Sequence, residues 1–434
     1  MAIKQIEKLI LDKKIKIGII GLGYVGLPLA VEFAKAGIKT LGFEISAPKV
    51  KDINKGKSYI DDIPSALVKK LSVSKLLKAT TKFSELKKQD FIIVCVPTPL
   101  RKSKDPDVSY ILTATREIAK YMRKEQIIIF ESTTYPGTTK ELVKPILEET
   151  GLKAGKDFFL AFSPERVDPG NKVFTITNTP KVVGGITGAC TKLATMIYQL
   201  VANKVIPVSN TETAEIVKLL ENTFRAVNIA MVNEFALMCN KLNLDIWEIM
   251  NAASSKPFGF MPFYPGPGIG GHCIPLDPHY LGWKMKTLNF EPRFIELASA
   301  INSHMPEYTA DRIAELLNTQ KKALSASKIL LIGIAYKSNI TDPRESPARD
   351  VFLLLEKMGA AVNYHDPYIP LATINGKKYK SIKITMAVLR KYDCVAIMTD
   401  HSNVDYKSIV KNSKLIFDAR NALKNFRNKK INKL

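Results

Sequence analysis

The chain has 434 residues and a formal charge of +23, with 46% hydrophobic and 24% charged residues. At roughly 150 residues per domain this length predicts two or three domains, and the composition excludes extensive disorder. No run approaches the roughly 18 apolar residues needed to cross a bilayer, so an integral membrane protein is excluded too.

Short β-branched runs alternate with longer helical stretches from residue 15 to about residue 205. Apolar runs bounded by turn residues and separated by helix-period segments predict parallel strands with crossover helices. The predicted strands are 16–20, 39–43, 91–96, 127–131 and 158–162. The first residues mix charged and apolar side chains, which predicts no secretory signal.

A glycine-rich turn follows the first predicted strand. Gly21, Gly23 and Gly26 form a G-x-G-x-x-G pattern that opens a predicted helix. The glycines permit a tight turn, and the helix N-terminus offers N–H groups to a pyrophosphate. The second strand ends at Glu44, whose carboxylate would accept hydrogen bonds from ribose hydroxyls and repel a 2′-phosphate. NAD binding is therefore predicted. The alternative, a surface glutamate at a strand end, holds only if the glycines are also accidental.

One long helix is predicted from residue 211 to about residue 241, because no glycine or proline interrupts the chain until Pro257. At 1.5 Å per residue it would be about 47 Å long. Ser209 and Glu212 fit a capping box at its start. The helix is apolar on most of its circumference, which predicts burial on several sides. The apolar positions are Ile216, Leu219, Leu220, Val227, Ala230 and Met231.

Three polar residues share one stripe of this helix. Lys218, Asn222 and Arg225 lie at i, i+4 and i+7. Lysine and asparagine donors turned toward a cleft would stabilise an oxyanion, and the same spacing also fits a solvated face. The pattern alone leaves both interpretations open.

Residues 257–278 contain six prolines and five glycines, a density typical of a functional loop. Gly270 and Gly271 let the backbone bring the thiol of Cys273 close to a ligand, and Asp277 follows four residues later. A thiolate is a strong nucleophile that a nearby cation would activate. His272 is interpreted as structural, because none of the five histidines is spaced for zinc.

A second α/β region begins at Lys328, with predicted strands near 362–364, 394–398 and 415–417. The order along the chain is therefore α/β, helical, α/β. The five cysteines are scattered and form no C-x-x-C pair, which argues against disulfides or a metal site and predicts a cytoplasmic location. The four outside the loop are interpreted as small buried hydrophobes: Cys95, Cys190, Cys239 and Cys394.

The excess of basic residues has two interpretations: the protein binds a polyanion, or it binds an anionic small substrate. No basic run is interleaved with aromatic residues, so nucleic-acid binding is disfavoured.

Ordered motifs along nearly the whole chain resemble the UDP-glucose/GDP-mannose dehydrogenase family of nucleotide-sugar dehydrogenases. They are GLGYVGLP (21–28), CVPTP (95–99), ESTTYPGTT (131–139), SPERVDPG (163–170), KLLENTFRAVNIAMVNE (218–234), YPGPGIGGHCIPLDP (264–278), GIAYKSNITDPRESP (333–347) and FDARN (417–421). Within the family, three segments most resemble bacterial UDP-N-acetylglucosamine 6-dehydrogenases: ESTTYPGTT, SPERVDPG and the loop at 256–278.

The resemblance implies an α/β fold of two Rossmann-like doubly wound parallel-sheet domains joined by a central helical domain with one long helix. The implied boundaries are 1–208 for NAD binding, 209–322 for a helical dimerisation domain with the catalytic loop, and 323–434 for UDP binding. It also implies a homodimer or higher homo-oligomer that makes precursors for surface polysaccharide.

The implied reaction oxidises a sugar C6 alcohol to a carboxylate with two NAD+ in sequence. Asp277 assists proton removal through water, and Lys218 stabilises the alkoxide or takes the proton. Cys273 attacks the aldehyde, giving a thiohemiacetal and then a thioester. Lys218 and Asn222 hold the oxyanion, and Glu165 manages the hydrolytic water.

Further residues match family positions that bind ligands. On the cofactor side these are Thr98, Thr134 and Arg344, in addition to the glycines and Glu44. On the substrate side they are Lys337, Arg420 and Tyr264. Two cations suit a diphosphate, although either could be an exposed basic residue of a basic chain.

The main alternatives to UDP-N-acetylglucosamine as substrate are other UDP-sugars. UDP-N-acetylgalactosamine and UDP-N-acetylmannosamine differ from UDP-N-acetylglucosamine by the orientation of one group. UDP-glucose is disfavoured, because Ile269 and Leu276 replace the phenylalanine and lysine typical of UDP-glucose enzymes. A binding protein without catalysis and a polyanion-binding protein are more distant alternatives.

Overall fold

The computed structural model describes residues 3–60, 62–101, 105–167, 171, 173–271 and 273–434. The chain divides into two compact units. The first comprises Met1–Glu221 and His279–Phe290, and the second comprises Asn222–Pro278 and Glu291–Leu434. Each unit contains a parallel or mainly parallel sheet with a core on both faces.

The first unit is built on an eight-stranded sheet with the order β3-β2-β1-β4-β5-β6-β7-β8. Its strands are β1 (Lys16–Ile20), β2 (Lys39–Phe43), β3 (Leu77–Thr80), β4 (Phe91–Val94), β5 (Ile127–Phe130), β6 (Phe159–Phe162), β7 (Lys181–Gly185) and β8 (Val205–Val208). All neighbours pair in parallel except β6 and β7. The strand order reverses between β1 and β4, which is where doubly wound sheets bind nucleotides. The five predicted strands are confirmed, and β3, β7 and β8 are additional.

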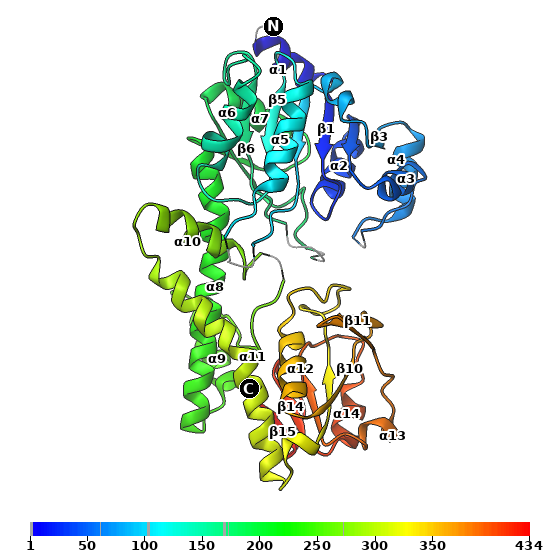
Figure 1. Ribbon diagram of the computed structural model, residues 1–434, viewed down its shortest axis with the longest axis vertical. Coiled ribbons are helices and arrows are strands. Elements are labelled where there is room, and N and C mark those ends of the chain that lie inside the picture. Colours follow the sequence, from blue (N-terminus) through cyan, green and yellow to red (C-terminus); the bar gives the residue numbers. More distant parts are fainter. Residues whose placement is uncertain (1–2, 61, 102–104, 168–170, 172, 272) are drawn as a thin grey trace. The chain divides into compact units, whose positions relative to one another are not determined.

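Helices cover both faces of this sheet (Figure 1). Alternate side chains of each strand point to opposite faces, so Ile17 and Ile19 enter one core while Ile20 enters the other. The first core includes residues of α1 (Ile3–Leu11), α2 (Gly26–Lys35), α3 (Ala47–Asn54), α4 (Ser65–Val73) and α7 (Gly188–Tyr198). The second includes residues of α5 (Ser109–Tyr121) and α6 (Lys144–Glu148), and of the short turns η1 (Phe83–Lys88) and η2 (Thr139–Val143).

The predicted long helix is confirmed as α8 (Thr211–Leu242), which has 32 residues. Its predicted capping box is wrong. The side-chain oxygen of Asn210 accepts hydrogen bonds from the N–H and the hydroxyl of Thr213, at 2.8 and 2.7 Å. These two bonds make Asn210 the capping residue, so the helix begins one residue later than a Ser209 cap requires.

The predicted burial of α8 on several sides is only partly correct. Leu219 and Ala230 are buried, but Ile216, Leu220 and Met231 are 41%, 64% and 43% exposed. These side chains are apolar, so their exposure shows that the described part of the chain does not cover this side of the helix.

The second unit contains a five-stranded parallel sheet with the order β10-β9-β13-β14-β15. Its strands are β9 (Lys328–Ile332), β10 (Ala361–His365), β13 (Cys394–Ile397), β14 (Ile416–Asp418) and β15 (Ile431–Lys433). A separate antiparallel hairpin joins β11 (Leu371–Ile374) to β12 (Lys377–Lys380). The order reverses between β9 and β13, which again marks the ligand-binding edge of such sheets.

Helices α11 (Arg293–Thr319) and α12 (Pro347–Lys357) contribute to the core on one face of the second sheet, and α13 (Met386–Leu389) and α14 (Tyr406–Asn412) to the other. The remaining helical elements are α9 (Ile246–Ala253), α10 (Asp277–Thr287) and η3 (Leu324–Ala326). The predicted α/β fold with two Rossmann-like sheets and one long helix is therefore confirmed.

Candidate active site

The glycine-rich turn links β1 to α2 and is shaped by its three glycines. Gly21 has φ +88°, and a Cβ there would lie 2.6 Å from the Cys95 carbonyl oxygen. A Cβ on Gly26 would lie 1.9 Å from the Gly21 oxygen. A Cβ on Gly23 would meet nothing within 4 Å, so the turn is closed against the protein and open on its outer side. This geometry fits a pyrophosphate at the N-terminus of α2.

Glu44 follows β2 and is 8% exposed. Its carboxylate accepts hydrogen bonds from the N–H groups of Leu22, at 3.2 Å, and Ser46, at 3.0 Å. The first bond ties the carboxylate to the glycine-rich turn itself. A fixed carboxylate beside a phosphate-binding turn fits the ribose of a dinucleotide, so this part of the first unit suits NAD.

Two other predicted cofactor residues follow neighbouring strands of the same sheet. Thr98 lies after β4, and its carbonyl accepts a hydrogen bond from the Tyr280 hydroxyl. Thr134 lies after β5, is buried, and shares a 2.7 Å hydroxyl–hydroxyl hydrogen bond with Thr138. The turns after β1, β2, β4 and β5 therefore all carry predicted cofactor residues at the carboxyl edge of the sheet.

Glu165 follows β6, and its carboxylate is held by three donors. One oxygen accepts the N–H groups of Arg166 and Val167, at 2.8 and 2.6 Å. The other accepts the Lys181 ammonium at 3.0 Å. Burial disfavours the charge, but the Lys181 ammonium, the Val167 N–H and the charge of Lys218 together hold the pKa of Glu165 below its usual range. No local sequence motif predicts Lys181 as part of a site.

In the second unit, the turn after Cys273 leads directly into α10. The Cys273 carbonyl accepts the N–H groups of Leu276 and Asp277, at 3.1 and 2.8 Å. The thiol-bearing residue is exposed, whereas the other four cysteines are buried, as predicted. His272, interpreted from the sequence as structural, lies outside the described residues.

Asn222 and Asp277 are both buried at 4% exposure, and the Asn222 amide donates a hydrogen bond to the Asp277 carboxylate. The structure thus brings together two predicted catalytic residues that are 55 positions apart in sequence. Lys218 lies one turn before Asn222 on α8 and is half-buried, while Arg225 on the same stripe is exposed.

The loop before Cys273 passes closely over Tyr336. A Cβ on Gly270 would lie 2.6 Å from the Tyr336 Cβ, and one on Gly271, which has φ +89°, would lie 2.8 Å from the Tyr336 ring. Only glycine permits so close an approach. The contact places this loop against the segment that follows β9 and carries Lys337.

Arg420 follows β14 on the same edge of the second sheet. Its Nε donates a hydrogen bond to the Met398 carbonyl at 3.0 Å, and a Cβ on Gly266 would lie 2.5 Å from its guanidinium. Lys337 and Arg420 thus extend from strand ends at the edge predicted to bind a nucleotide.

Two predicted ligand residues have partners within the second unit. Tyr264 is 48% exposed and stacks on Trp247 with ring centroids 6.0 Å apart. Arg344 forms an ion pair with Asp342 at 2.7 Å.

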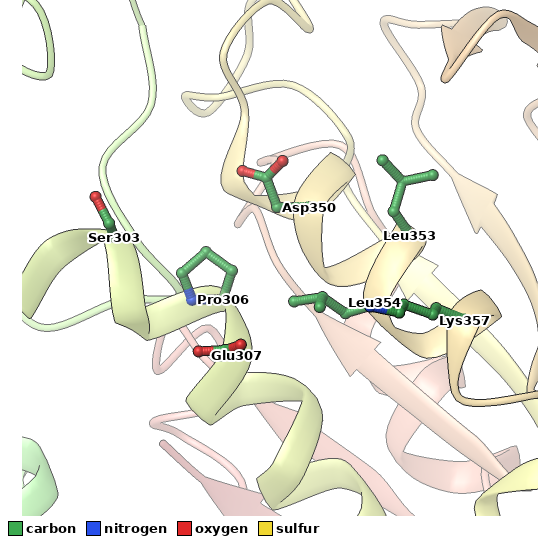
Figure 2. Close-up of a pocket in the computed structure, with 7 residues that line it drawn as sticks. All are labelled: Ser303, Pro306, Glu307, Asp350, Leu353, Leu354 and Lys357. Carbon is green, nitrogen blue, oxygen red and sulfur yellow. The ribbon is translucent and has the colours of Figure 1, made fainter. Parts of the chain in front are cut away.

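A cavity of about 380 Å³ lies between α11 and α12 (Figure 2). Its lining residues are Ser303, Pro306, Glu307, Asp350, Leu353, Leu354 and Lys357. None of the predicted site residues is among them.

Within the ranges that the structure describes, no group of three His, Cys, Asp or Glu residues could hold a metal ion. Over the same ranges, no helix combines the length and apolar character required to span a membrane.

Three family models match successive parts of the chain. The NAD binding domain of the UDP-glucose/GDP-mannose dehydrogenase family matches residues 15–202. The central domain of that family matches residues 212–304, and its UDP binding domain matches residues 330–425.

Among curated proteins, a UDP-N-acetyl-D-mannosamine dehydrogenase from Pyrococcus horikoshii is 35% identical over 416 residues, 94% of this chain and 96% of the relative. A UDP-N-acetyl-D-glucosamine 6-dehydrogenase from Salmonella typhi is 32% identical and covers 94% of this chain and 97% of the relative.

Solved structures match over similar lengths. A UDP-D-ManNAc dehydrogenase from Pyrococcus horikoshii has a TM-score of 0.88 at 33% identity and covers 96% of this chain and 98% of that one. An NDP-N-acetyl-D-galactosaminuronic acid dehydrogenase from Methanosarcina mazei Go1 has a TM-score of 0.82 at 32% identity, covering 99% and 97%.

Proposed function

Because the chain belongs to the UDP-glucose/GDP-mannose dehydrogenase family, we propose that it oxidises the C6 alcohol of a UDP-N-acetylhexosamine to the uronic acid. It is an NAD-dependent oxidoreductase with a UDP-binding domain. Relatives named for N-acetylglucosamine and N-acetylmannosamine substrates, each covered almost completely, support an N-acetylhexosamine. UDP-N-acetylglucosamine is the sugar we favour, since the loop motifs most resemble enzymes acting on it.

The observation that carries this proposal is an exposed thiol one turn from a buried Asn–Asp pair. When bound, NAD+ accepts a hydride from the sugar C6 in each of two oxidations. The Cys273 thiolate adds to the intermediate aldehyde, and the resulting thiohemiacetal is oxidised to a thioester. One site can then perform both oxidations without releasing the aldehyde.

Lys218, Asn222 and Asp277 manage charge and protons in the proposed reaction. Asp277 accepts the hydroxyl proton through water, and Lys218 stabilises the alkoxide or takes the proton itself. Asn222 and Lys218 donate hydrogen bonds to the oxyanion, and losing one such donor typically costs about 10²–10³ in rate. The Asn222 amide already donates one hydrogen bond to Asp277, which fixes the orientation of the amide.

Glu165 orients the water that hydrolyses the thioester. Attack by this water releases the uronic acid and regenerates the Cys273 thiol. A carboxylate held by three donors changes orientation little during the reaction, as a water-positioning group requires.

Ligand contacts are divided between the two sheets. We assign Gly21, Gly23, Gly26, Glu44, Thr98 and Thr134 to NAD, with Arg344 as a further cofactor contact. We assign Lys337, Arg420 and Tyr264 to the UDP-sugar. In this assignment residues 1–208 bind NAD, 209–322 form the helical domain and 323–434 bind UDP.

A homodimer and a cytoplasmic location complete the proposal. The dimer is supported by the uncovered apolar side chains of α8, and the location by the scattered, unpaired spacing of the cysteines in the sequence.

Counting NADH per sugar tests the reaction. We expect two NADH for each UDP-uronic acid formed. Cys273→Ser should bind NAD and UDP-sugar normally and form no acid, because a serine hydroxyl is not ionised near neutral pH. Cys239→Ala, at a buried cysteine, is the matched control and should keep its turnover. One NADH per sugar, or acid formation by Cys273→Ser at the wild-type rate, would contradict the thioester route.

A panel of UDP-sugars distinguishes the alternatives. The highest kcat/KM on UDP-N-acetylmannosamine, UDP-N-acetylgalactosamine or UDP-glucose would replace our choice of sugar and leave the chemistry unchanged. Salt-sensitive DNA binding without NAD-linked turnover would instead favour a polyanion-binding protein.

A further inference from the structure

A buried ion network lies behind Glu165 in the first unit. The Lys181 ammonium is 2.9 Å from a Glu131 carboxylate oxygen and 3.0 Å from a Glu165 oxygen. The three side chains, in the order Lys181, Glu131 and Glu165, are 3%, 0% and 11% exposed. The Tyr198 hydroxyl donates to the same Glu131 oxygen, and its ring centroid lies 5.1 Å from the ammonium.

The network depends on the antiparallel pairing of β6 with β7. Glu131 follows β5 and Glu165 follows β6, so both lie at the carboxyl edge. Strand β7 runs antiparallel to β6, with Phe162 paired to Gly184. Its first residue, Lys181, therefore reaches that same edge, whereas a parallel strand would place its first residue at the opposite edge.

The charges of the network are unequal, since one ammonium faces two carboxyl groups. Burial raises the pKa of Glu131. Burial alone would lower the pKa of Lys181, but the two carboxylates raise it overall. Glu165 has a lowered pKa, so of the two carboxyl groups Glu131 binds a proton more readily and Glu165 ionises more readily.

We propose that Lys181 is a positioning residue for thioester hydrolysis: it fixes the orientation and the negative charge of the Glu165 carboxylate, while Glu131 and Tyr198 hold Lys181 in place. This inference rests on the proposed role of Glu165. Two backbone N–H groups donate to the first Glu165 oxygen, and Lys181 donates to the second. Without the ammonium, the buried carboxylate would lose its nearest compensating charge.

Removing Lys181 alone would leave two buried carboxyl groups facing each other and could unfold the unit. The informative variant is therefore Lys181→Met with Glu131→Gln, which removes the ammonium together with the carboxyl group that faces Glu165 and keeps both side-chain lengths. The amide oxygen introduced by Glu131→Gln would still accept the Tyr198 hydroxyl. Lys181→Arg retains the cation, and Lys284→Met, which removes a partly buried partner of Glu141, is the matched control.

The experiment follows the acylated enzyme. Rapid-mixing NADH traces report the oxidations, and intact-protein mass after quenching reports the thioester on Cys273. We expect Glu165→Gln and the double variant to keep the initial NADH burst, to accumulate the adduct and to turn over at least tenfold more slowly. Lys181→Arg should recover most of the turnover, and Lys284→Met should match wild type.

A pH series separates positioning from a merely structural effect. Groups that face the network and can titrate or carry charge are Lys181, Lys218, Arg166, Glu131, Glu221, Tyr198 and Cys95. Without Lys181 the pKa of Glu165 should rise. Deacylation in the double variant should therefore increase with pH from 6 to 8 relative to wild type, and a loss of packing would not produce this recovery.

The outcomes are distinguishable. If Glu165→Gln accumulates no adduct, the proposed role of Glu165 is wrong and the inference falls with it. If Glu165→Gln stalls but the double variant turns over like wild type, or stalls equally at every pH, the role of Lys181 is wrong while the proposed function stands.

Discussion

Glu44 combines a sequence signal with a specific local geometry. The sequence predicts a carboxylate at the end of the second strand, and the structure ties that carboxylate to the Leu22 N–H in the glycine-rich turn. Both features follow from local order along the chain, because β2 pairs directly with β1 in register. A fixed anion at this position accepts ribose hydroxyls and repels an extra phosphate.

Replacing Glu44 with alanine should weaken NAD binding about tenfold, as loss of a hydrogen bond to a charged group predicts. The preference for NAD over NADP should narrow, because the repulsion of a 2′-phosphate disappears. Dissociation constants from cofactor fluorescence titrations would measure both effects. Glu32→Gln on α2, which removes a surface partner of Lys35, is the control. An unchanged cofactor preference would refute the ribose role.

Lys181, unlike Glu44, is a residue whose role the sequence does not predict. Nothing in its local sequence distinguishes it from the other lysines of a chain with 64 basic residues. Its importance comes from two carboxylates that lie 50 and 16 positions away in sequence. Local patterns do not encode such contacts.

At the scale of elements, helix α8 has an apolar face that a single chain leaves exposed. Within the second unit, Phe224, Met231, Phe235, Met238 and Leu242 are each between 43% and 66% exposed. Their spacings of seven, four, three and four residues place them on one face of the helix. A helix face this apolar is typical of a protein–protein interface.

Phe235→Glu should dissociate the proposed dimer, because a carboxylate buried against an apolar face loses hydration without gaining a partner. Sedimentation analysis across a concentration series would report a monomer for this variant and a dimer for wild type. Lys241→Glu changes the charge on the same helix away from the apolar stripe and should remain dimeric. A Phe235→Glu chain that sediments like wild type would exclude this face as the interface.

At the scale of the whole molecule, buried carboxyl groups link stability to pH. Glu215 on α8 accepts the N–H of Gly137 and both the N–H and hydroxyl of Thr139, at 2.6, 2.9 and 2.7 Å. These bonds join the long helix to the turn after β5 within the first unit. Burial nevertheless raises the pKa of Glu215 from 4.5 to about 7.

A raised carboxyl pKa means that the folded state binds the proton more tightly than the unfolded state. The contribution of Glu215 to the free energy of unfolding is therefore fully present below about pH 4.5 and is lost as the pH rises to about 7. The loss is on the order of 3 kcal/mol. The stability advantage of wild type over Glu215→Gln should accordingly decrease between pH 5 and pH 7.5.

Hydrogen exchange of first-unit peptides, followed by mass spectrometry at both pH values, would measure this change. Glu212→Gln is the matched control on the same helix. Burial raises the pKa of Glu212, but its hydrogen bond to Lys140 lowers it overall. The stability from a lowered carboxyl pKa is lost only below about pH 4.5, so the difference between wild type and Glu212→Gln should stay nearly constant between pH 5 and pH 7.5. A wild-type advantage over Glu215→Gln that grows with pH would contradict the raised pKa.

Local sequence patterns were sufficient to predict the glycine-rich turn, the carboxylate of Glu44 at the end of the second strand, the long helix and the loop that carries Cys273. Each depends on backbone freedom, side-chain period or strand order over fewer than about 35 residues. The wrong prediction of the capping residue of α8 also concerns neighbouring residues. Ser209 and Asn210 are both good N-caps, and only the hydrogen bonds from Thr213 identify Asn210 as the cap.

Tertiary structure alone decided which distant residues share a site. The hydrogen bond between Asn222 and Asp277 and the ion pair between Lys181 and Glu165 both depend on chain reversals. The ion pair also depends on the antiparallel direction of β7. It also decided which apolar residues of α8 stay uncovered. The physical reason is that burial and ion pairing are properties of packed neighbours, and a sequence specifies those neighbours only through the complete fold.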